Sequence, residues 1–121
     1  MCRHLAYWGP PASLAPLTLH GPRALIEQCT SAREMAWGTE NLDGWGFAWL
    51  DDDGLPRRYS TGLPMTGDPN GRQMLESIVS GRFIVHIRQK TPGSLTDGSN
   101  TAPFWDGGTR FFSHNGFVPD F

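Results

Sequence analysis

The residue whose type and position could do chemistry is Cys2, which directly follows Met1. Cysteine is small enough for an aminopeptidase to remove Met1, and removal would leave a free α-amino group beside the thiol. An α-amino group titrates near pH ~8, so it is a base close to neutral pH, next to a nucleophile. The segment Met1-Cys2-Arg3-His4 alone is a weak signal, because a lone cysteine is more often a small buried apolar residue.

Two further polar clusters supply what an N-terminal thiol lacks. One is His86-Ile87-Arg88 with the following Thr91-Pro92-Gly93-Ser94, and the other is Ser113-His114-Asn115-Gly116. Each cluster lies at the end of an expected strand. If these strand ends gather on one side of a sheet, a thiol, a guanidinium group, a side-chain amide and a backbone N–H share one site.

Such a set of groups fits acyl transfer from a substrate that carries a carboxylate. The Asn115 amide and the Gly116 N–H could donate to an oxyanion, and Arg88 could grip the carboxylate through two parallel bonds. Each residue also has a structural explanation. An Asn-Gly pair is most often a turn, a strand arginine is most often a surface charge, and His86 or His114 is more often a hydrogen-bonded structural residue.

The elements that must position these groups follow from apolar periodicity and turn residues. In chain order we predict a strand over 5–8 ended by Gly9-Pro10-Pro11, a helix over 22–30, a strand over 45–50, a turn at 51–54, a strand over 56–61, a helix over 70–79 closed by Gly81, and a strand over 83–88. Within 109–116 we predict a last strand that runs into a tight turn at Asn115-Gly116. This order predicts an α+β fold with mostly antiparallel pairing.

Three local features refine this picture. Gly44 and Gly46 alternate with aromatic residues, which lets a backbone segment pass close to that strand. Cys29 lies on the apolar face of the expected helix 22–30 and is expected in the core. The loop 89–103 is too long for a simple connection, and loops of this length are typically functional or disordered.

Composition excludes several classes of function. The net charge is −2 and the ten Lys and Arg residues are scattered, so nucleic acid and anionic membranes are poor partners. The sequence has no apolar run of ~18 residues and no signal-peptide pattern, which favours a cytoplasmic protein with reduced thiols. The four histidines and two cysteines are isolated, which predicts no metal site, and the run 51–53 lacks the later glutamate of a calcium loop.

Taken in order, five motifs resemble the type 2 glutamine amidotransferase group of N-terminal nucleophile hydrolases. They are Met1-Cys2, Asp43-Gly44-Trp45-Gly46, the segment 86–93, Asn100-Thr101-Ala102-Pro103-Phe104, and Ser113-His114-Asn115-Gly116. The longer matches at 1–7 and 43–49 are most similar to the subfamily of ergothioneine biosynthesis, which removes glutamate from γ-glutamyl-hercynylcysteine sulfoxide. In the family a tryptophan follows the strand arginine, whereas Gln89 follows Arg88 here.

The resemblance implies a four-layer αββα sandwich and hydrolysis of a small γ-glutamyl amide through a Cys2 thioester. The α-amino group of Cys2 would be the base, Asn115 and Gly116 the oxyanion hole, and Arg88 the group that binds the glutamyl carboxylate. Thr91 and His86 would also line the substrate site. The family needs no metal or organic cofactor.

Family domains continue well past the His-Asn-Gly segment, so we expect residues 1–121 to be the N-terminal part of one domain, with an incomplete sandwich. The family's acidic residue for the substrate α-amino group would lie in the missing part, and Asp120 is not expected to replace it. Two alternative functions stay open: a glutaminase that supplies ammonia to a partner, and a non-catalytic binding domain in which Met1 is retained. The possible partners are a homo-oligomer or the missing C-terminal segment.

Overall fold

The central sheet has two different faces because small or polar residues alternate with large apolar ones along its strands. The computed structural model describes residues 1–35 and 38–116. Its sheet contains β1 (Arg3–Ser13), β4 (Val79–Ile87), β2 (Trp45–Leu50) and β3 (Pro56–Thr61) in that spatial order, and every neighbouring pair is antiparallel. The predicted α+β class with antiparallel pairing is therefore confirmed.

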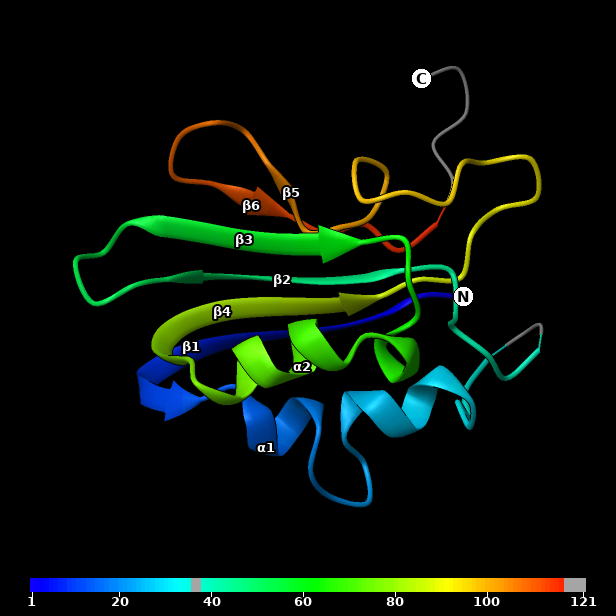
Figure 1. Cartoon of the computed structure of the whole chain (residues 1–121), viewed down its shortest axis with the longest axis horizontal. Helices are drawn as coiled ribbons and strands as arrows, with labels where there is room; N and C mark the ends of the chain where they lie inside the picture. Colours follow the sequence, from blue (N-terminus) through cyan, green and yellow to red (C-terminus); the bar gives the residue numbers. More distant parts are fainter. Residues whose placement is uncertain (36–37, 117–121) are drawn as a thin grey trace.

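One face of the sheet carries the hydrophobic core and all the helical segments (Figure 1). These segments are α1 (Ala15–Thr18), the 3₁₀ helices η1 (Leu25–Cys29) and η2 (Met65–Gly67), and α2 (Pro69–Glu76). The sheet contributes Trp45, Phe47, Phe83, Val85 and Ile87, and the helical segments contribute Leu25, Cys29, Met65 and Leu75. The predicted core position of Cys29 is confirmed, since its side chain is 0% exposed.

The opposite face, which we call the outer face, is covered by the long segment 89–116 (Figure 1). This segment includes the short hairpin of β5 (Phe104–Trp105) and β6 (Phe111–Phe112). It can lie against the sheet because Gly46 has no side chain: a Cβ atom there would be 2.7 Å from the Ala102 carbonyl oxygen. The predicted close backbone approach at Gly46 is therefore confirmed.

Arg58 of β3 fixes the same segment to the outer face. Its guanidinium group donates to the carbonyl oxygens of Thr101 at 3.0 Å, Gly98 at 3.3 Å and Pro103. Ser60, also on β3, donates to the Gly98 carbonyl at 2.8 Å. Burial lowers the pKa of Arg58, but an arginine keeps its charge at any pH at which the protein folds. A charged group that satisfies several buried carbonyl groups holds this loop rigidly.

On the core side, the carboxylate of Asp68 joins α2 to the sheet. It is 4% exposed and accepts three hydrogen bonds, from Trp45 Nε1 at 3.0 Å, the Tyr59 hydroxyl at 2.6 Å and the Gly71 N–H at 3.0 Å. Burial by itself raises the pKa of Asp68, but the hydrogen bonds from Tyr59, Gly71 and Trp45 outweigh it and hold the pKa below its usual range. Asp68 therefore caps the helix and anchors two core aromatics together.

The first strand is longer than predicted. Gly9-Pro10-Pro11 was expected to end it, but β1 continues to Ser13 with a register shift between Trp8 and Ala12. The prolines are tolerated because β1 is an edge strand, where a missing N–H costs no ladder bond and a bulge absorbs the irregularity. The prediction that the strand stops at residue 9 is therefore wrong.

Both predicted helices differ from the observed ones. The segment 22–30 forms only the 3₁₀ helix η1, because Ala24 has a non-helical ψ of 152°. The helix predicted over 70–79 is α2 and ends at Glu76, since Val79 and Ser80 pair with the extended end of β1. Gly81 lies inside β4 and does not close a helix. The helix α1 was not predicted.

The last predicted strand, 109–116, is reduced to the two residues of β6. Its partner β5 follows directly after the loop 89–103 and was not predicted. Two-residue strands are too short to give a periodic signal, so β5 left no pattern in the sequence.

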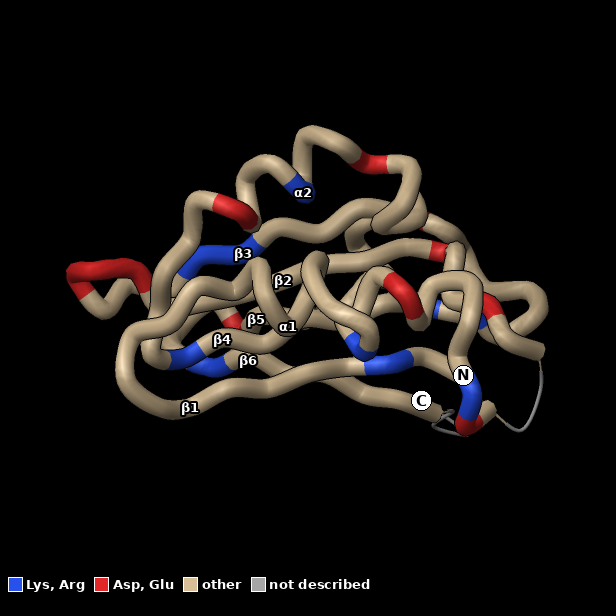
Figure 2. Tube along the Cα trace, turned by 90° about the horizontal axis from the view of Figure 1, so that it is seen from below, with Lys and Arg blue, Asp and Glu red and all other residues tan. Residues whose placement is uncertain are grey.

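Charged residues are spread over the fold, and the acidic turn 51–53 lies at the end of the sheet opposite the N-terminus (Figure 2). Within the described part of the chain, no helix has the length and apolar character needed to cross a bilayer.

The role of Asp68 can be tested with Asp68→Asn in the purified protein. The variant loses the charge that accepts three hydrogen bonds, so we expect the free energy of unfolding at pH 7 to fall by about 2–3 kcal/mol. Chemical denaturation followed by tryptophan fluorescence measures this change. The exposed Asp52→Asn is the matched control and should change the value by less than about 0.5 kcal/mol.

The difference in the free energy of unfolding between Asp68→Asn and the wild type should also depend on pH. The pKa of Asp68 is lower in the folded protein than in the unfolded chain, so its stabilising contribution is complete above pH ~4 and is lost as the pH falls through the folded pKa. The difference in the free energy of unfolding between Asp68→Asn and the wild type should therefore become smaller below pH ~4. A gap that stays constant between pH 7 and pH 3 would contradict this assignment.

Gly46→Ala tests the contact between the sheet and the segment 89–116. The added Cβ atom would lie 2.7 Å and 2.8 Å from the carbonyl oxygens of Ala102 and Tyr59, both of them backbone atoms. We expect a loss of about 1–3 kcal/mol in the free energy of unfolding, as for overpacked sites. Gly108→Ala is the control, because the nearest atom to its Cβ is 3.4 Å away, and equal stability of the two variants would refute the constraint.

Candidate active site

Cys2 is positioned by the pairing of β1 with β4. Arg3 lies opposite Ile87 in the sheet, which brings Cys2 beside the residues that follow β4. The Cys2 thiol is 3.5 Å from the Gln89 carbonyl oxygen, the atom to which it donates. The proposed nucleophile thus directly precedes the paired strand β1 and is held by its bond to Gln89, so it is not on a fraying end.

The Asp43-Gly44 pair fixes the end of β4 from the other side. The Asp43 N–H donates to the Arg88 carbonyl oxygen at 2.9 Å, and the Arg88 N–H donates to the Gly44 carbonyl oxygen at 2.9 Å. The Asp43 carboxylate accepts from the Lys90 N–H at 2.9 Å. The sequence motif at 43–46 therefore holds the chain on which Arg88 sits.

The third polar cluster reaches the same place. The Ser113 hydroxyl lies 2.9 Å from His86 Nδ1 and 3.2 Å from His4 Nδ1, and the Asn115 side-chain amide donates to the Cys2 carbonyl oxygen at 3.0 Å. The three clusters come from the beginning, the middle and the end of the chain. The expectation that the strand ends gather at one edge of the sheet is confirmed.

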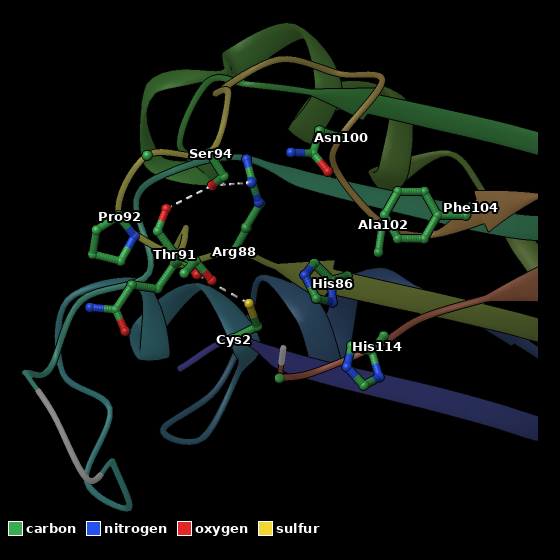
Figure 3. A pocket seen from close by; sticks show the side chains of 13 residues that line it. Cys2, His86, Arg88, Thr91, Pro92, Ser94, Asn100, Ala102, Phe104 and His114 are labelled. Carbon is green, nitrogen blue, oxygen red and sulfur yellow. Dashed lines mark hydrogen bonds between the residues drawn. The ribbon is translucent and has the colours of Figure 1, made fainter. Parts of the chain in front are cut away.

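A pocket of about 440 Å³ opens between these clusters (Figure 3). Five of the six residues predicted from sequence for this site line it: Cys2, His86, Arg88, Thr91 and Gly116. Figure 3 shows Cys2 and His86 in the middle, with Arg88, Thr91 and Ser94 toward one end and Phe104 and His114 toward the other. We call these the polar end and the aromatic end.

At the polar end, Arg88 is 7% exposed and already bonded to the protein. Its Nη1 donates to the carbonyl oxygens of Leu95 at 2.8 Å and Asp43 at 3.5 Å, and its Nη2 donates to the Ser94 hydroxyl at 3.0 Å. These bonds use three of the five N–H groups of a guanidinium. Among the described residues no acceptor lies against Nε–H or the second Nη2–H, and this edge of the guanidinium can hold a carboxylate bidentately.

Asn115 is placed beside Cys2, although it does not line the pocket. Its amide faces the backbone of the proposed nucleophile, through the bond to the Cys2 carbonyl oxygen. Gly116 lines the pocket and has a φ of +136°, the conformation for which an Asn-Gly pair is suited. The oxyanion-hole role of these two residues stays a prediction.

His86 is 2% exposed and sits where the three clusters meet. Burial, together with the nearby His4 and Arg88, lowers the pKa of His86 to about 4. At neutral pH the ring is therefore uncharged, with one nitrogen as donor and the other as acceptor. The Ser113 hydroxyl bridges it to His4, and this contact orients the imidazole at the floor of the pocket.

Sequence reasoning missed several residues at the site. Gln89 accepts from the Cys2 thiol through its carbonyl and from the Met1 α-amino group through its side chain. Its only signal in the sequence was the departure from the family tryptophan at this position. Phe104, Ala102 and Asn100 line the pocket, and their motif was noted only as part of the resemblance. Asp120 lies outside the described residues.

The second cysteine has no part in this site. Cys29 is buried in the core, where desolvation and then the nearby Glu27 raise its pKa to about 12. A thiol with so high a pKa is inert at neutral pH. Both cysteines are free, and across residues 1–35 and 38–116 no three His, Cys, Asp or Glu side chains are arranged to hold a metal ion.

Comparison with known proteins agrees with the motifs. Residues 14–121 match the family model of class-II glutamine amidotransferases. The chain is also 38% identical, over 118 residues, to the gamma-glutamyl-hercynylcysteine sulfoxide hydrolase of Mycolicibacterium smegmatis. The alignment covers 98% of this chain and 52% of that relative, so the chain spans about half the length of the curated relative. With nearly the whole chain inside the matched region, the protein belongs to the class-II glutamine amidotransferase family.

Proposed function

We propose that the protein hydrolyses a γ-glutamyl amide, with Cys2 as nucleophile after removal of Met1. The observation that carries this proposal is the meeting of Cys2, Arg88 and Gly116 in one pocket, from three distant parts of the chain. A thiol, a carboxylate-binding guanidinium and an oxyanion donor are the groups that acyl transfer from a glutamyl carbonyl requires.

In the first half of the reaction, the Cys2 α-amino group takes the thiol proton and the sulfur attacks the γ-carbonyl carbon. The carbonyl oxygen becomes an oxyanion, which the Asn115 amide and the Gly116 N–H stabilise. Collapse of this intermediate breaks the C–N bond, and the α-ammonium group returns its proton to the leaving amine. The product is a thioester between Cys2 and the glutamyl group.

In the second half, the same α-amino group deprotonates a water molecule that attacks the thioester. Cleavage of the C–S bond releases glutamate and restores the thiol. In this step the Asn115 amide, which donates to the Cys2 carbonyl oxygen in the structure, would exchange that bond for one with the oxyanion formed at the Cys2 sulfur. The mechanism needs no further cofactor.

The glutamyl end of the substrate belongs at the polar end of the pocket. The free edge of Arg88 binds the α-carboxylate, and Thr91 and Ser94 lie beside it. The matched relative is named for a gamma-glutamyl-hercynylcysteine sulfoxide, which favours a conjugate of this kind as substrate over glutamine. The group that binds the substrate α-amino end would lie in further chain.

We also propose that further chain packs over and beside the segment 89–116, on the outer side of the sheet, and completes a four-layer αββα sandwich. Trp8 is 81% exposed, Phe112 60% and Trp105 50%, and such apolar surface is typical of a face that is covered in the complete protein. The relative has about as much additional chain as the matched part contains, which is enough for another sheet and its helices.

Cys2→Ala in the complete gene product tests the nucleophile. Intact mass first establishes that Met1 is removed, and glutamate release from γ-glutamyl conjugates and from glutamine is then measured. We expect the rate in Cys2→Ala to fall by at least about 10³-fold, as for loss of other catalytic nucleophiles. Cys29→Ala removes the other thiol, which is buried on the far side of the sheet, and should keep the activity. Full activity of Cys2→Ala would refute the mechanism.

Arg88→Lys tests carboxylate recognition. Lysine keeps the charge but loses the planar fork, so we expect KM for a γ-glutamyl amide to rise roughly 10- to 100-fold. The measurement is repeated with a 4-aminobutanoyl amide, which has the same scissile bond but no α-carboxylate. The variant should lose little on this second substrate. An equal loss on both substrates would mean that Arg88 only holds the loop through Leu95 and Ser94.

A further inference from the structure

The Cys2 carbonyl oxygen accepts hydrogen bonds from two side chains, and the proposed reaction removes one of them. The Asn115 amide donates to this oxygen at 3.0 Å, and Arg3 Nη1 donates to it at 3.2 Å. When Asn115 moves to the oxyanion, its bond to the carbonyl oxygen is lost. A carbonyl oxygen has two lone pairs, so the bond from Arg3 does not depend on the bond from Asn115. Arg3 is therefore the donor that stays on residue 2 during the chemical step.

The two donors come from opposite faces of the sheet. Side chains alternate along a strand, and Leu5, two residues after Arg3, packs against the core on the helical side. His4 points the other way and contacts the segment 89–116 on the outer side. The Arg3 side chain therefore projects on the helical side, whereas Asn115 belongs to the outer segment. The carbonyl oxygen is thus held from both faces.

Arg3 is itself fixed at both its backbone and its side chain. Its backbone pairs with Ile87 as the first residue of β1, and its Nη2 donates to the Glu34 carbonyl oxygen beyond η1. A guanidinium group is charged at every pH at which the protein folds, and its donors form a rigid planar fork. Hydrogen bonds from a charged donor are roughly twice as strong as those between neutral groups. The bond from Arg3 is therefore suited to persist while a neutral amide exchanges its acceptor.

Residue 2 needs such a donor because it lies just outside the paired part of β1, which begins at Arg3. Removal of Met1 also removes the bond between its α-amino group and Gln89. The thiol then donates to the Gln89 carbonyl oxygen, but this bond ends when the sulfur loses its proton and attacks. The bond from Asn115 ends in the same step. Of these contacts, only the bond from Arg3 is independent of the chemistry.

We propose that Arg3 is a positioning residue, which holds the Cys2 carbonyl oxygen while Asn115 moves to the oxyanion. This inference rests on the proposed function and adds the residue that makes the exchange of Asn115 favourable. Arg3 does not line the pocket, so it acts on the reaction through residue 2 and not through the substrate. Its loss should therefore lower kcat and leave KM nearly unchanged.

Arg3→Met tests this role in the complete gene product. Intact mass first establishes that Met1 is removed from the variant and the wild type, and kcat and KM are then measured for a γ-glutamyl amide. Methionine keeps an unbranched stem but donates no hydrogen bond, so we expect kcat to fall roughly 5- to 20-fold and KM to stay within about twofold. A higher KM with wild-type kcat would overturn the inference, because Arg3 would then act on substrate binding.

Arg3→Lys is a milder second variant that keeps the charge and loses the fork. A single ammonium group does not replace both bonds of the guanidinium, so its kcat should lie between those of Arg3→Met and the wild type. Wild-type kcat in either variant would overturn the inference. Arg23→Met is the matched control, because Arg23 is an exposed arginine on the same surface cleft as Arg3. It should keep wild-type kcat, and a loss equal to that of Arg3→Met would overturn the inference in favour of a general charge effect.

A double-mutant cycle with Asn115→Ala separates positioning from general loosening of the N-terminus. In the Asn115→Ala background no bond is exchanged at the Cys2 carbonyl oxygen. Arg3→Met should then lower kcat by less than about threefold, compared with the larger loss in the presence of Asn115. Equal losses in the two backgrounds would overturn the proposed coupling between Arg3 and Asn115.

Failure of the proposed function has a different signature. If the processed wild-type protein releases glutamate neither from γ-glutamyl amides nor from glutamine, the hydrolase assignment is wrong. The hold of Arg3 on residue 2 is then read from the ¹³C chemical shift of the Cys2 carbonyl carbon, with Cys29 as the internal reference in the same labelled protein. A change in Arg3→Met that is absent in Arg23→Met supports this hold. No change, or the same change in both variants, overturns it.

Discussion

The antiparallel ladder between β1 and β4 is the constraint on which the candidate site depends. Because Arg3 pairs with Ile87, the second residue of the chain and the residue after β4 are adjacent whatever the loops do. A shift of β4 by one residue against both of its neighbours, β1 and β2, would turn His86 to the core side and bring Val85 and Ile87 to the outer face. Such a shift would expose the large core side chains of β4 and is therefore strongly unfavourable. Packing in the core thus keeps His86 and Arg88 beside Cys2.

Small residues and arginines on the outer face hold the segment 89–116 against the sheet. Gly46 lets the segment 89–116 approach the sheet, and Arg58 and Arg88 bind that segment through its backbone carbonyl groups. An apolar loop could not cover a sheet in this way without leaving buried carbonyl groups unpaired. The two arginines therefore replace the secondary structure that the loop lacks, and they give a segment rich in Gly, Pro, Ser and Thr a defined shape.

The features that could be predicted from the sequence are those determined by residues close together in the chain. The strands 45–50 and 56–61, the core position of Cys29 and the close approach at Gly46 were predicted, because apolar runs, a turn and small residues encode them directly. The length of β1, the end of α2 and the β5–β6 hairpin were not, since each depends on a partner strand distant in sequence. At the site, residue types indicated Cys2, Arg88 and Gly116, whereas the second role of Arg88 in holding the loop required the fold.

The two ends of the pocket are positioned by different elements of the fold. Cys2, His86 and Arg88 sit on or beside β1 and β4, where register fixes them, while Phe104 and Phe112 sit on a hairpin of two-residue strands attached by a loop. Substitutions in the hairpin can therefore change that end of the pocket without displacing the proposed nucleophile.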